Sequence, residues 1–502
     1  MFKKVLIANR GEIAIRVIRC LRELGIQSVV VYSDADRESL AVRWANQAVH
    51  LPGVASADTY MDIDKVIAAA KKTGAEAIHP GYGFLSENAN FARRCVEEGL
   101  VFIGPNPESI TKMGDKTTAR DIMIARGVPV TPGFQEEGAT PEQVFEAAKK
   151  IGFPVMIKAS AGGGGKGMRL VRDPEQFTSS FEMARSEAIN AFGDGRIYVE
   201  KFIVNPRHIE VQIVCDKHGN MVHFHERECS IQRRHQKVIE EAPSPVVDPE
   251  SRARVGDIAL RAAEAAGYDS IGTVEFLMDK DKNFYFMEMN TRLQVEHPVT
   301  EMITGRDLVQ IQIDIAAGKP LDFKQEDIAL HGHSVECRIY AEDPSKNFMP
   351  SPGKIIGLTT PNGMGVRDDS GVYQGYEVPI HYDPMISKLA TWGATRQEAI
   401  NRMSRALGEY KISGIETNLW FHRRLMHHKA FVEGDMDTGF IEKHPELLVK
   451  NPGEQTNPDM ALVAAAIKYY KDQVGKSVEG SENETESTNG WKAYARRSMV
   501  GY

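Results

Sequence analysis

The sequence has few cysteines and no long hydrophobic run. Its five cysteines stand far apart, at positions 20, 95, 215, 229 and 337, and no two of them form a CxxC pair. This spacing excludes a zinc ribbon or a disulfide framework and favours a reducing compartment. No apolar run reaches the roughly 18 residues that span a bilayer. We therefore expect a cytoplasmic protein that does not cross a membrane.

The chain also lacks an excess of positive charge. Its 61 Lys and Arg residues against 69 Asp and Glu give a net charge of −8, which argues against a general nucleic-acid-binding protein. With 42% hydrophobic and 26% charged residues the composition is that of a globular protein. The 502 residues suggest about three domains. The apolar stretch at 5–8 is too short for a signal peptide and predicts a buried strand.

The first hundred residues alternate between strand and helix patterns. A strand at 4–8 is followed by Gly11, a helix and a second strand at 28–32. This alternation predicts a parallel sheet covered by helices. Gly11 stands alone at the first turn, so the GxGxxG dinucleotide fingerprint is absent. Asp34 and Asp36 could bind a ribose, but we expect them to lie in a solvated turn.

In the rest of the chain the sequence pattern changes near residues 115, 331 and 451. An α+β middle region is indicated by strand patterns at 154–159, 168–171, 197–202, 208–215, 222–225, 273–279 and 284–290. A third region begins with a strand at 333–340. Beyond it we predict an amphipathic helix at 459–474 and a flexible acidic linker at 475–490. The aromatic and basic residues 491–497 either dock on this protein or on a partner, or they form a frayed tail.

A glycine run, GGGGKG at 162–167, follows the strand at 154–159. Glycine costs roughly 0.5–1 kcal/mol relative to alanine in regular structure, so the run needs another reason. Its backbone N–H groups can fold over a phosphate, although the spacing is not that of a P-loop. We predict a phosphate-covering loop rather than a linker. Lys158 ends the strand before it and can reach the same phosphate.

Two glutamates face each other across a predicted hairpin. If the hairpin is symmetric about residues 280–283, Glu275 pairs with Glu288 and Leu277 pairs with Phe286. Opposed carboxylates repel, and a divalent cation would reverse that repulsion. With Asn290 on the same face, the set predicts a Mg²⁺ or Mn²⁺ site. The alternative is that both glutamates face solvent.

If the extended chain continues past the hairpin, three further polar residues share this face. Arg292 could hold an oxyanion bidentately, and Glu296, with Gln294 between them, could accept a proton as a general base. A structural ion pair between Arg292 and Glu296 is the alternative.

Several long motifs together resemble the biotin carboxylases, which are ATP-grasp ligases. They are IANRGEIA (7–14), HPGYGFLSEN (79–88), GGGGKGM (162–168), EKFI (200–203), CSIQRRHQK (229–237), EMNTRLQVEHPVTE (288–301) and ECR (336–338). The resemblance covers about residues 1–445. Ala161 and Lys166 stand where relatives often have glycine and arginine.

The resemblance implies a fold of mixed α/β and α+β class with three domains. These are an N-terminal parallel-sheet, Rossmann-like domain (1–114), a central ATP-grasp domain (115–330) and a C-terminal β-rich domain (331–445). A mobile lid would span about 131–203 of the ATP-grasp domain. Residues 446–502 would form the helix, linker and tail.

The resemblance also implies a role for each matching residue in the ATP- and bicarbonate-dependent carboxylation of biotin. The ATP site would comprise Lys116, Lys158, Gly164, Gly165, Glu200, Lys201, Ile203, His208, Gln232, His235, Glu275 and Glu288. Glu275, Glu288 and Asn290 would hold two Mg²⁺ or Mn²⁺ ions. Bicarbonate would bind Lys237, Arg292, Gln294 and Val295. Glu296 would deprotonate it, and Arg338 would contact biotin; Lys237, Arg292, Glu296 and Arg338 form the implied catalytic set.

No Met-Lys-Met biotinylation sequence occurs in the chain, and about 60 residues follow the resembling region. We therefore expect a homodimer that works with a separate biotin carboxyl carrier protein or biotinylated subunit, and with a separate carboxyltransferase subunit. The final acceptor could be pyruvate, acetyl-CoA or propionyl-CoA; the tethered tail resembles the A subunit of split pyruvate carboxylases. Two alternatives are another ATP-grasp ligase acting on bicarbonate, such as carbamoyl-phosphate synthetase, and an inactive scaffold subunit.

Overall fold

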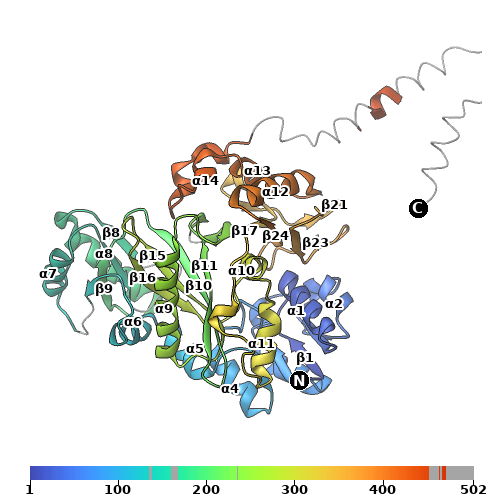
Figure 1. The fold of residues 1–502 in the computed structure, drawn as a ribbon, viewed down its shortest axis with the longest axis horizontal. Coiled ribbons are helices and arrows are strands. Elements are labelled where there is room, and N and C mark those ends of the chain that lie inside the picture. Colours follow the sequence, from blue (N-terminus) through green and yellow to red (C-terminus); the bar gives the residue numbers. More distant parts are fainter. Residues whose placement is uncertain (135–137, 160–167, 235, 451–462, 464–465, 471–502) are drawn as a thin grey trace, which may run out of the picture. The chain divides into compact units, whose positions relative to one another are not determined.

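The computed structural model describes residues 1–134, 138–159, 168–234, 236–450, 463 and 466–470. The chain divides into two compact units, residues 1–448 and residues 449–502. All of the sheets described below belong to the first unit (Figure 1).

The N-terminal region is a five-stranded parallel sheet in the order β3-β2-β1-β4-β5, which confirms the predicted parallel sheet. Its strands are β1 (Lys4–Ile7), β2 (Gln27–Tyr32), β3 (Gln47–His50), β4 (Ala77–His79) and β5 (Val101–Phe102). The helices between them are α1 (Gly11–Glu23), α2 (Leu40–Trp44), α3 (Ile63–Thr73) and α4 (Ala89–Glu97). Residues 5–7 of the central strand are fully buried, because helices cover both faces of a parallel sheet.

The turn after β2 differs from the predicted solvated turn. Asp36 is 1% exposed, and its carboxylate accepts hydrogen bonds from Arg10 Nε and the Tyr60 hydroxyl, both at 2.6 Å. Asp34 is half exposed and accepts from the backbone N–H of Gly53. The prediction is therefore wrong for Asp36, because the guanidinium of Arg10, next to β1, is largely withdrawn from water and requires a carboxylate partner.

An eight-stranded sheet in the order β16-β15-β10-β11-β14-β17-β24-β22 forms the centre of the first unit. Its strands are β10 (Arg207–Cys215), β11 (Met221–Glu228), β14 (Ile239–Ala242), β15 (Ser270–Met278), β16 (Phe284–Asn290), β17 (His333–Tyr340), β22 (Val366–Ser370) and β24 (Met385–Gly393). Every paired neighbour is antiparallel. Since β14 pairs with β17, the sheet continues across residue 330 and joins the middle region to the third region.

A smaller antiparallel sheet in the order β6-β9-β7-β8 lies within the predicted lid. It comprises β6 (Gly133–Phe134), β7 (Val155–Ala159), β8 (Met168–Val171) and β9 (Ile197–Lys201), and it packs with α7 (Pro141–Ile151) and α8 (Phe177–Phe192). These elements share a hydrophobic core of their own, which includes Val155, Phe177 and Val199. The glycine run that connects β7 to β8 lies outside the described residues.

The hairpin of β15 and β16 confirms one predicted pair and corrects the other. Glu275 pairs with Glu288, as expected, but the register shifts next to Glu275 and Leu277 pairs with Tyr285 instead of Phe286. The extra residue is Met287, which makes a β-bulge in β16. The bulge shifts the register by one residue only in the pairs between it and the turn. The two carboxylates lie on the other side of the bulge and face each other as predicted.

The remaining elements surround these sheets (Figure 1). The helices are α5 (Pro107–Gly114), α6 (Lys116–Ala125), α9 (Pro249–Ala266), α10 (His297–Thr304), α11 (Leu308–Ala316), α12 (Arg396–Glu409), α13 (Leu419–Leu425), α14 (Lys429–Glu433) and α15 (Phe440–Lys443). The short strands are β12 (Gln232–Arg233), β13 (Gln236–Lys237), β18 (Glu342–Asp343), β19 (Met349–Pro350), β20 (Gly353–Lys354), β21 (Gly357–Thr359), β23 (Glu377–Val378) and β25 (Lys411–Ser413).

Of the helix predicted at 459–474, residues 463 and 466–470 are described and are helical. The rest of that segment, the predicted linker at 475–490 and the cluster at 491–497 lie outside the described residues. Within the described part of the chain, no helix is both long enough and apolar enough to cross a membrane.

Candidate active site

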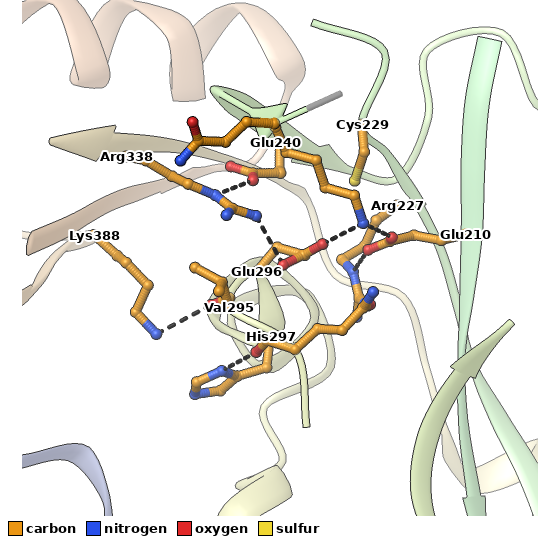
Figure 2. Close-up of polar contacts among 12 residues, drawn as sticks. Glu210, Arg227, Cys229, Glu240, Val295, Glu296, His297, Arg338 and Lys388 are labelled. Atoms are coloured by element: carbon orange, nitrogen blue, oxygen red, sulfur yellow. Dashed lines mark hydrogen bonds and ion pairs between the residues drawn. The ribbon is translucent and has the colours of Figure 1, made fainter. Parts of the chain in front are cut away.

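A buried glutamate between two cations forms the centre of the site. Glu296 immediately precedes α10 and is 2% exposed. One of its oxygens accepts from Lys237 Nζ at 2.6 Å. The other accepts from Arg338 Nη2 at 3.0 Å (Figure 2). Burial favours the neutral acid, but these two cations outweigh it and hold the pKa of Glu296 well below its usual value. The carboxylate is therefore ionised in the resting site.

Lys237, on β13, contacts three carboxylates at once. Its Nζ donates to Glu296, to Glu275 Oε1 at 2.8 Å and to Glu210. Burial opposes the positive charge, but the three carboxylates outweigh it and raise the pKa of Lys237 well above its usual value. Sequence reasoning missed Glu210. Its signal is the alternation of His208, Glu210 and Gln212 in an otherwise apolar strand, which places three polar side chains on one face.

Arg227 was also missed, although it is completely buried beneath this cluster. Its guanidinium donates to Glu210 (Figure 2). It also donates to Gln294 Oε1 at 2.6 Å and to Gln212 Oε1 at 2.8 Å. It also reaches hydroxyl oxygens on β15 and α10. One arginine thus ties three elements to the chain segment that precedes Glu296.

The predicted metal ligands gather at the bulged hairpin. Asn290 donates from Nδ2 to Glu275 Oε1 at 2.8 Å, and Glu288 is the cross-strand partner of Glu275. His208 Nε2 lies 2.9 Å from Glu275 Oε2, and Lys116 Nζ lies 3.4 Å from Glu288. Burial opposes ionisation of Glu275, but Lys237 and His208 outweigh it and hold its pKa well below the usual value.

This donor set fits a divalent cation. Two carboxylates and an amide supply hard oxygen ligands, which Mg²⁺ and Mn²⁺ prefer. Ionised Glu275 stands directly across the ladder from a second glutamate, an arrangement that needs positive charge to be stable. The nearby Gln232 donates to His208 Nδ1 at 2.7 Å and so fixes the imidazole that contacts Glu275.

The chain past β16 turns instead of continuing as a strand, yet its polar residues still converge on the site. Gln294 Nε2 donates to Glu275 Oε1 at 2.7 Å, and Arg292 donates to Asn290 Oδ1 at 2.9 Å. Arg292 also donates from Nε to Glu87 Oε2 at 2.9 Å. Glu87 was missed as a site residue, although it lies in the motif at 79–88. It brings the N-terminal region into contact with the site.

Another group of predicted residues lies on the four-stranded sheet. Lys158 forms an ion pair with Glu200, its near neighbour across β7 and β9. Lys201 donates to the carbonyl oxygens of residues 152 and 153, at 2.7 and 3.2 Å. Ile203 is half-buried just after β9. The remaining predicted members, Gly164, Gly165 and His235, lie outside the described residues.

Two buried carboxyl groups lie next to Arg338. Its Nε donates to Glu240 Oε1 at 2.6 Å (Figure 2), and Glu240 is in turn the cross-strand partner of Glu336. Both glutamates are fully buried. Burial raises the pKa of Glu240 to about 7 although Arg338 opposes the shift, and burial together with Glu240 raises that of Glu336 well above its usual value. Sequence reasoning missed this pair. Because both pKa values are raised, the pair can hold a proton next to Arg338.

The predicted Val295 contributes its backbone. Its carbonyl oxygen accepts from Lys388 Nζ at 3.0 Å (Figure 2), and Lys388 is fully buried. Lys388 also lies 3.2 Å from Glu12, whose pKa burial raises to about 7 although Lys388 lowers it. The segment before α10 is therefore held from β24 as well as from Arg227.

Three family models match the chain in succession. Residues 1–110 match the biotin carboxylase N-terminal domain, residues 115–324 the ATP-binding domain of the carbamoyl-phosphate synthase L chain, and residues 336–443 the biotin carboxylase C-terminal domain. This succession defines the class of protein: an ATP-binding domain flanked by the two other domains of a biotin carboxylase.

Individual relatives are similar over most of their length. The A subunit of pyruvate carboxylase from Methanothermobacter thermautotrophicus is 53% identical over 444 residues, which are 88% of this chain and 90% of that protein. Biotin carboxylase 1 of Bacillus subtilis is 52% identical over 445 residues, covering 88% and 99%. The chain belongs to the biotin carboxylase family, which confirms the resemblance inferred from its motifs.

A crystal structure supports the same assignment. The biotin carboxylase domain dimer of Hydrogenobacter thermophilus 2-oxoglutarate carboxylase, in complex with MgADP and bicarbonate, is similar with a TM-score of 0.85 and 48% identity. The match covers 90% of this chain and 99% of that chain. The fold prediction of a parallel N-terminal sheet, a central ATP-grasp region and a β-rich third region is thereby confirmed.

Proposed function

We propose that the chain catalyses the ATP-dependent carboxylation of biotin by bicarbonate, through carboxyphosphate. The observation that carries this proposal is the position of Glu296, which two cations hold beside Glu275 and the paired Glu288. A base, an oxyanion site and a metal site in one place are what phosphorylation of bicarbonate requires. The set is complete, which argues against an inactive scaffold.

Bicarbonate would bind where the cations converge. Lys237 and Arg292 supply positive charge to its oxygens, and Gln294 and Val295 complete the site. In the resting state Glu296 is a weak base because Lys237 and Arg338 stabilise its anion. When bicarbonate takes over contacts with Lys237, the carboxylate becomes more basic and can remove the bicarbonate proton. The anion then attacks the γ-phosphorus of ATP and ADP leaves.

Glu275, Glu288 and Asn290 would hold Mg²⁺ or Mn²⁺, which neutralises charge on the ATP phosphates. Lys116, Lys158 and His208 would also offset that charge, together with the backbone of Gly164 and Gly165. Glu200, Lys201 and Ile203 would hold adenine, and Gln232 and His235 would line the nucleotide site.

The proposed domain division is 1–114, 115–330 and 331–445, with a lid at about 131–203. Carboxyphosphate hydrolyses readily, so closure of such a lid would exclude water while it exists. The separate core of the four-stranded sheet supports this part of the proposal.

Arg338 would act in the second half of the reaction. Carboxyphosphate releases CO₂, and the phosphate that remains takes the proton from the biotin ureido nitrogen. Nitrogen then attacks CO₂, while Arg338 stabilises the negative ureido oxygen by a charge-assisted hydrogen bond. The hydrogen bond to Glu240 orients the guanidinium for this role.

We further propose that biotin arrives on a separate carrier protein or biotinylated subunit, that a carboxyltransferase subunit uses the product, and that the chain forms a homodimer. In support, one relative is part of a pyruvate carboxylase, while the Hydrogenobacter domain is a dimer. Because that relative is named for pyruvate, we favour pyruvate over acetyl-CoA and propionyl-CoA as the final acceptor.

Steady-state ATP turnover tests the function. We expect ADP release that requires bicarbonate and Mg²⁺ and that free biotin accelerates. ADP release at the same rate without bicarbonate would refute the proposal. Added ammonia or glutamine should change nothing, whereas stimulation by either would favour a ligase of the carbamoyl-phosphate synthetase type.

A further inference from the structure

A second group of metal-ligand side chains lies at the end of the first unit, in the third region of the chain. It consists of His428, which immediately precedes α14, His444, which follows α15, and Glu446 in the short 3₁₀ turn at 445–448. Their ligand atoms all lie within 4.8 Å of one another. None of these residues belongs to the ATP and bicarbonate site.

The geometry is that of ligands around one small ion. Glu446 Oε1 lies 3.1 Å from His428 Nε2 and 3.1 Å from His444 Nδ1. Ligands at about 2.0–2.2 Å in a tetrahedral zinc site are separated by roughly 3.3 Å, close to these values. The two imidazole rings lie only 4.3 Å apart between centroids. Three donors thus point at one place although the two histidines belong to different segments of the chain.

A purely hydrogen-bonded arrangement would fix the position of the His428 proton. Both ring nitrogens would have to donate to the same carboxylate oxygen, so His428 would carry its proton on Nε2. Its other nitrogen, Nδ1, would then be an acceptor, and it is buried without a hydrogen-bond partner among the described residues. Ligation of an ion through Nε2 would move the proton to Nδ1 and leave that nitrogen equally without a partner, so it is the convergence of the three ligand atoms that favours an ion.

Packing holds the ligands in place before any ion binds. The ring of Phe440 lies 4.7 Å from His444 and 5.7 Å from His428, between centroids. Arg424 on α13 donates to the backbone carbonyl oxygen of Glu446 at 3.3 Å. The two histidines are 18% and 26% exposed and Glu446 is 60% exposed, so an ion from solution can reach them.

We propose that His428, His444 and Glu446 form a binding site for a single Zn²⁺ ion. Two imidazoles and one carboxylate are ligands that suit Zn²⁺, whereas Mg²⁺ prefers oxygen ligands only. The fourth coordination position is open to water. The ion joins the last turn of the first unit to the start of α14, and so stabilises the point at which residues 449–502 begin. This site is independent of the proposed carboxylase function.

Titration of the untagged full chain with Co²⁺ tests the proposal, in excess Mg²⁺ so that the oxygen-ligand site is occupied. We expect one Co²⁺ per chain with the visible absorption of a tetrahedral complex, and displacement of Co²⁺ by Zn²⁺. His444→Ala removes a ligand and should weaken Zn²⁺ binding by more than the roughly 10–100-fold that loss of an outer-shell partner costs. Glu446→Gln keeps an oxygen that can accept both hydrogen bonds but removes the charge, and it should weaken binding as well.

Two control variants locate the site. His427→Ala removes a neighbouring histidine that contacts Ser404 Oγ at 2.8 Å, and Glu288→Gln alters the proposed ATP site. Both should bind Zn²⁺ as the unmodified chain does. Absence of Co²⁺ absorption, or equal Zn²⁺ affinity in the unmodified chain and in both ligand variants, would overturn the proposal. Since Glu446 is exposed, its variant is expected to fold even if His444→Ala does not.

Discussion

At the scale of single residues, the site depends on a balance of buried charges. Lys237 is 11% exposed and touches three carboxylates, while Arg227 beneath it is fully buried against one of the same three. Removing one partner of a buried ion pair leaves an uncompensated charge, which costs far more than the pair itself contributes. The cations that would bind bicarbonate are therefore also the groups that keep these carboxylates ionised.

Replacement of Lys237 by Gln tests this double role. We expect bicarbonate-dependent ATP turnover to be abolished and the free energy of unfolding to fall by about 3 kcal/mol, because the carboxylates around it lose their common partner. Urea denaturation and ADP release measure the two effects. Lys217→Gln, at an exposed position in the turn after β10, is the control and should change neither. An inactive Lys237→Gln with undiminished stability would show that Lys237 does not stabilise the fold.

Glu240 offers a test by pH. Its pKa is about 7 in the folded chain, against roughly 4.3 when unfolded, so the folded chain binds one more proton between these values. Stability that depends on this proton falls as the pH rises from about 5 to about 7. Glu240→Gln removes the proton, so over this range the free energy of unfolding of the variant should rise relative to that of the unmodified chain, by up to roughly 1.4 kcal/mol per pH unit.

Urea denaturation at several pH values measures that difference. Glu264→Gln, on the exposed side of α9, is the control and should show a constant difference from the unmodified chain. A pH-independent difference for Glu240→Gln would show that Glu240 is ionised throughout, in conflict with its burial opposite Glu336.

At the scale of elements, local sequence patterns predicted many of the longer strands. Apart from the hairpin of β15 and β16 and the parallel N-terminal sheet, they did not predict how the strands pair. The strands at 168–171, 284–290 and 333–340 have the predicted bounds, because period-2 alternation and apolar runs are local signals. The pairing of β14 with β17 joins residues about 95 positions apart, and no local pattern specifies it. The bulge at Met287 was missed for a related reason, since it appears only when both strands and the turn are known.

The candidate site shows the same limit. Most site residues in the long motifs were found. Glu210, Arg227 and Glu240, which lie outside those motifs, were missed, and so was Glu87 in the motif at 79–88. Their partners lie 15 to 205 positions away along the chain, so their roles depend on the assembled sheet. Alternation of polar residues in an apolar strand could have indicated Glu210. Nothing local distinguishes Glu240 from an ordinary surface glutamate.

The hairpin itself can be tested through Glu288. We expect Glu288→Gln to abolish ATP turnover at limiting Mg²⁺, because one of the two opposed carboxylates that favour a cation is gone. Added Mn²⁺ should restore part of the rate if the defect is in metal binding. Asp281→Asn, at the exposed turn of the same hairpin, is the control. An unchanged rate at limiting Mg²⁺ would refute the metal assignment.

At the scale of the whole molecule, contacts at the site join the N-terminal, middle and third regions of the first unit. The eight-stranded sheet joins the middle region to the third region through β14 and β17. The N-terminal region reaches the site through Glu87, which accepts from Arg292 Nε and from the backbone N–H of Thr291 at 3.0 Å. Lys388 and Glu12 make a second such connection from β24 to α1.

Glu87→Gln tests the connection from the N-terminal region. Without the charge, Arg292 loses orientation, so we expect the KM for bicarbonate to rise roughly tenfold, equivalent to ~1.4 kcal/mol. Because Glu87 is 41% exposed, thermal stability should change little. Glu97→Gln, at an exposed position on α4, is the control. A lower kcat with an unchanged KM for bicarbonate would show that Glu87 acts elsewhere.

The proposed chemistry rests on one step, the attack of bicarbonate itself on the γ-phosphorus of ATP. Turnover with ¹⁸O-labelled bicarbonate in unlabelled water, stopped before the label exchanges with solvent, follows this step directly. The attacking oxygen becomes the bridge of carboxyphosphate and stays on phosphorus when CO₂ leaves. We expect one ¹⁸O atom in each inorganic phosphate, detected by mass spectrometry. Inorganic phosphate without ¹⁸O would contradict the proposed function, because water would then be the nucleophile.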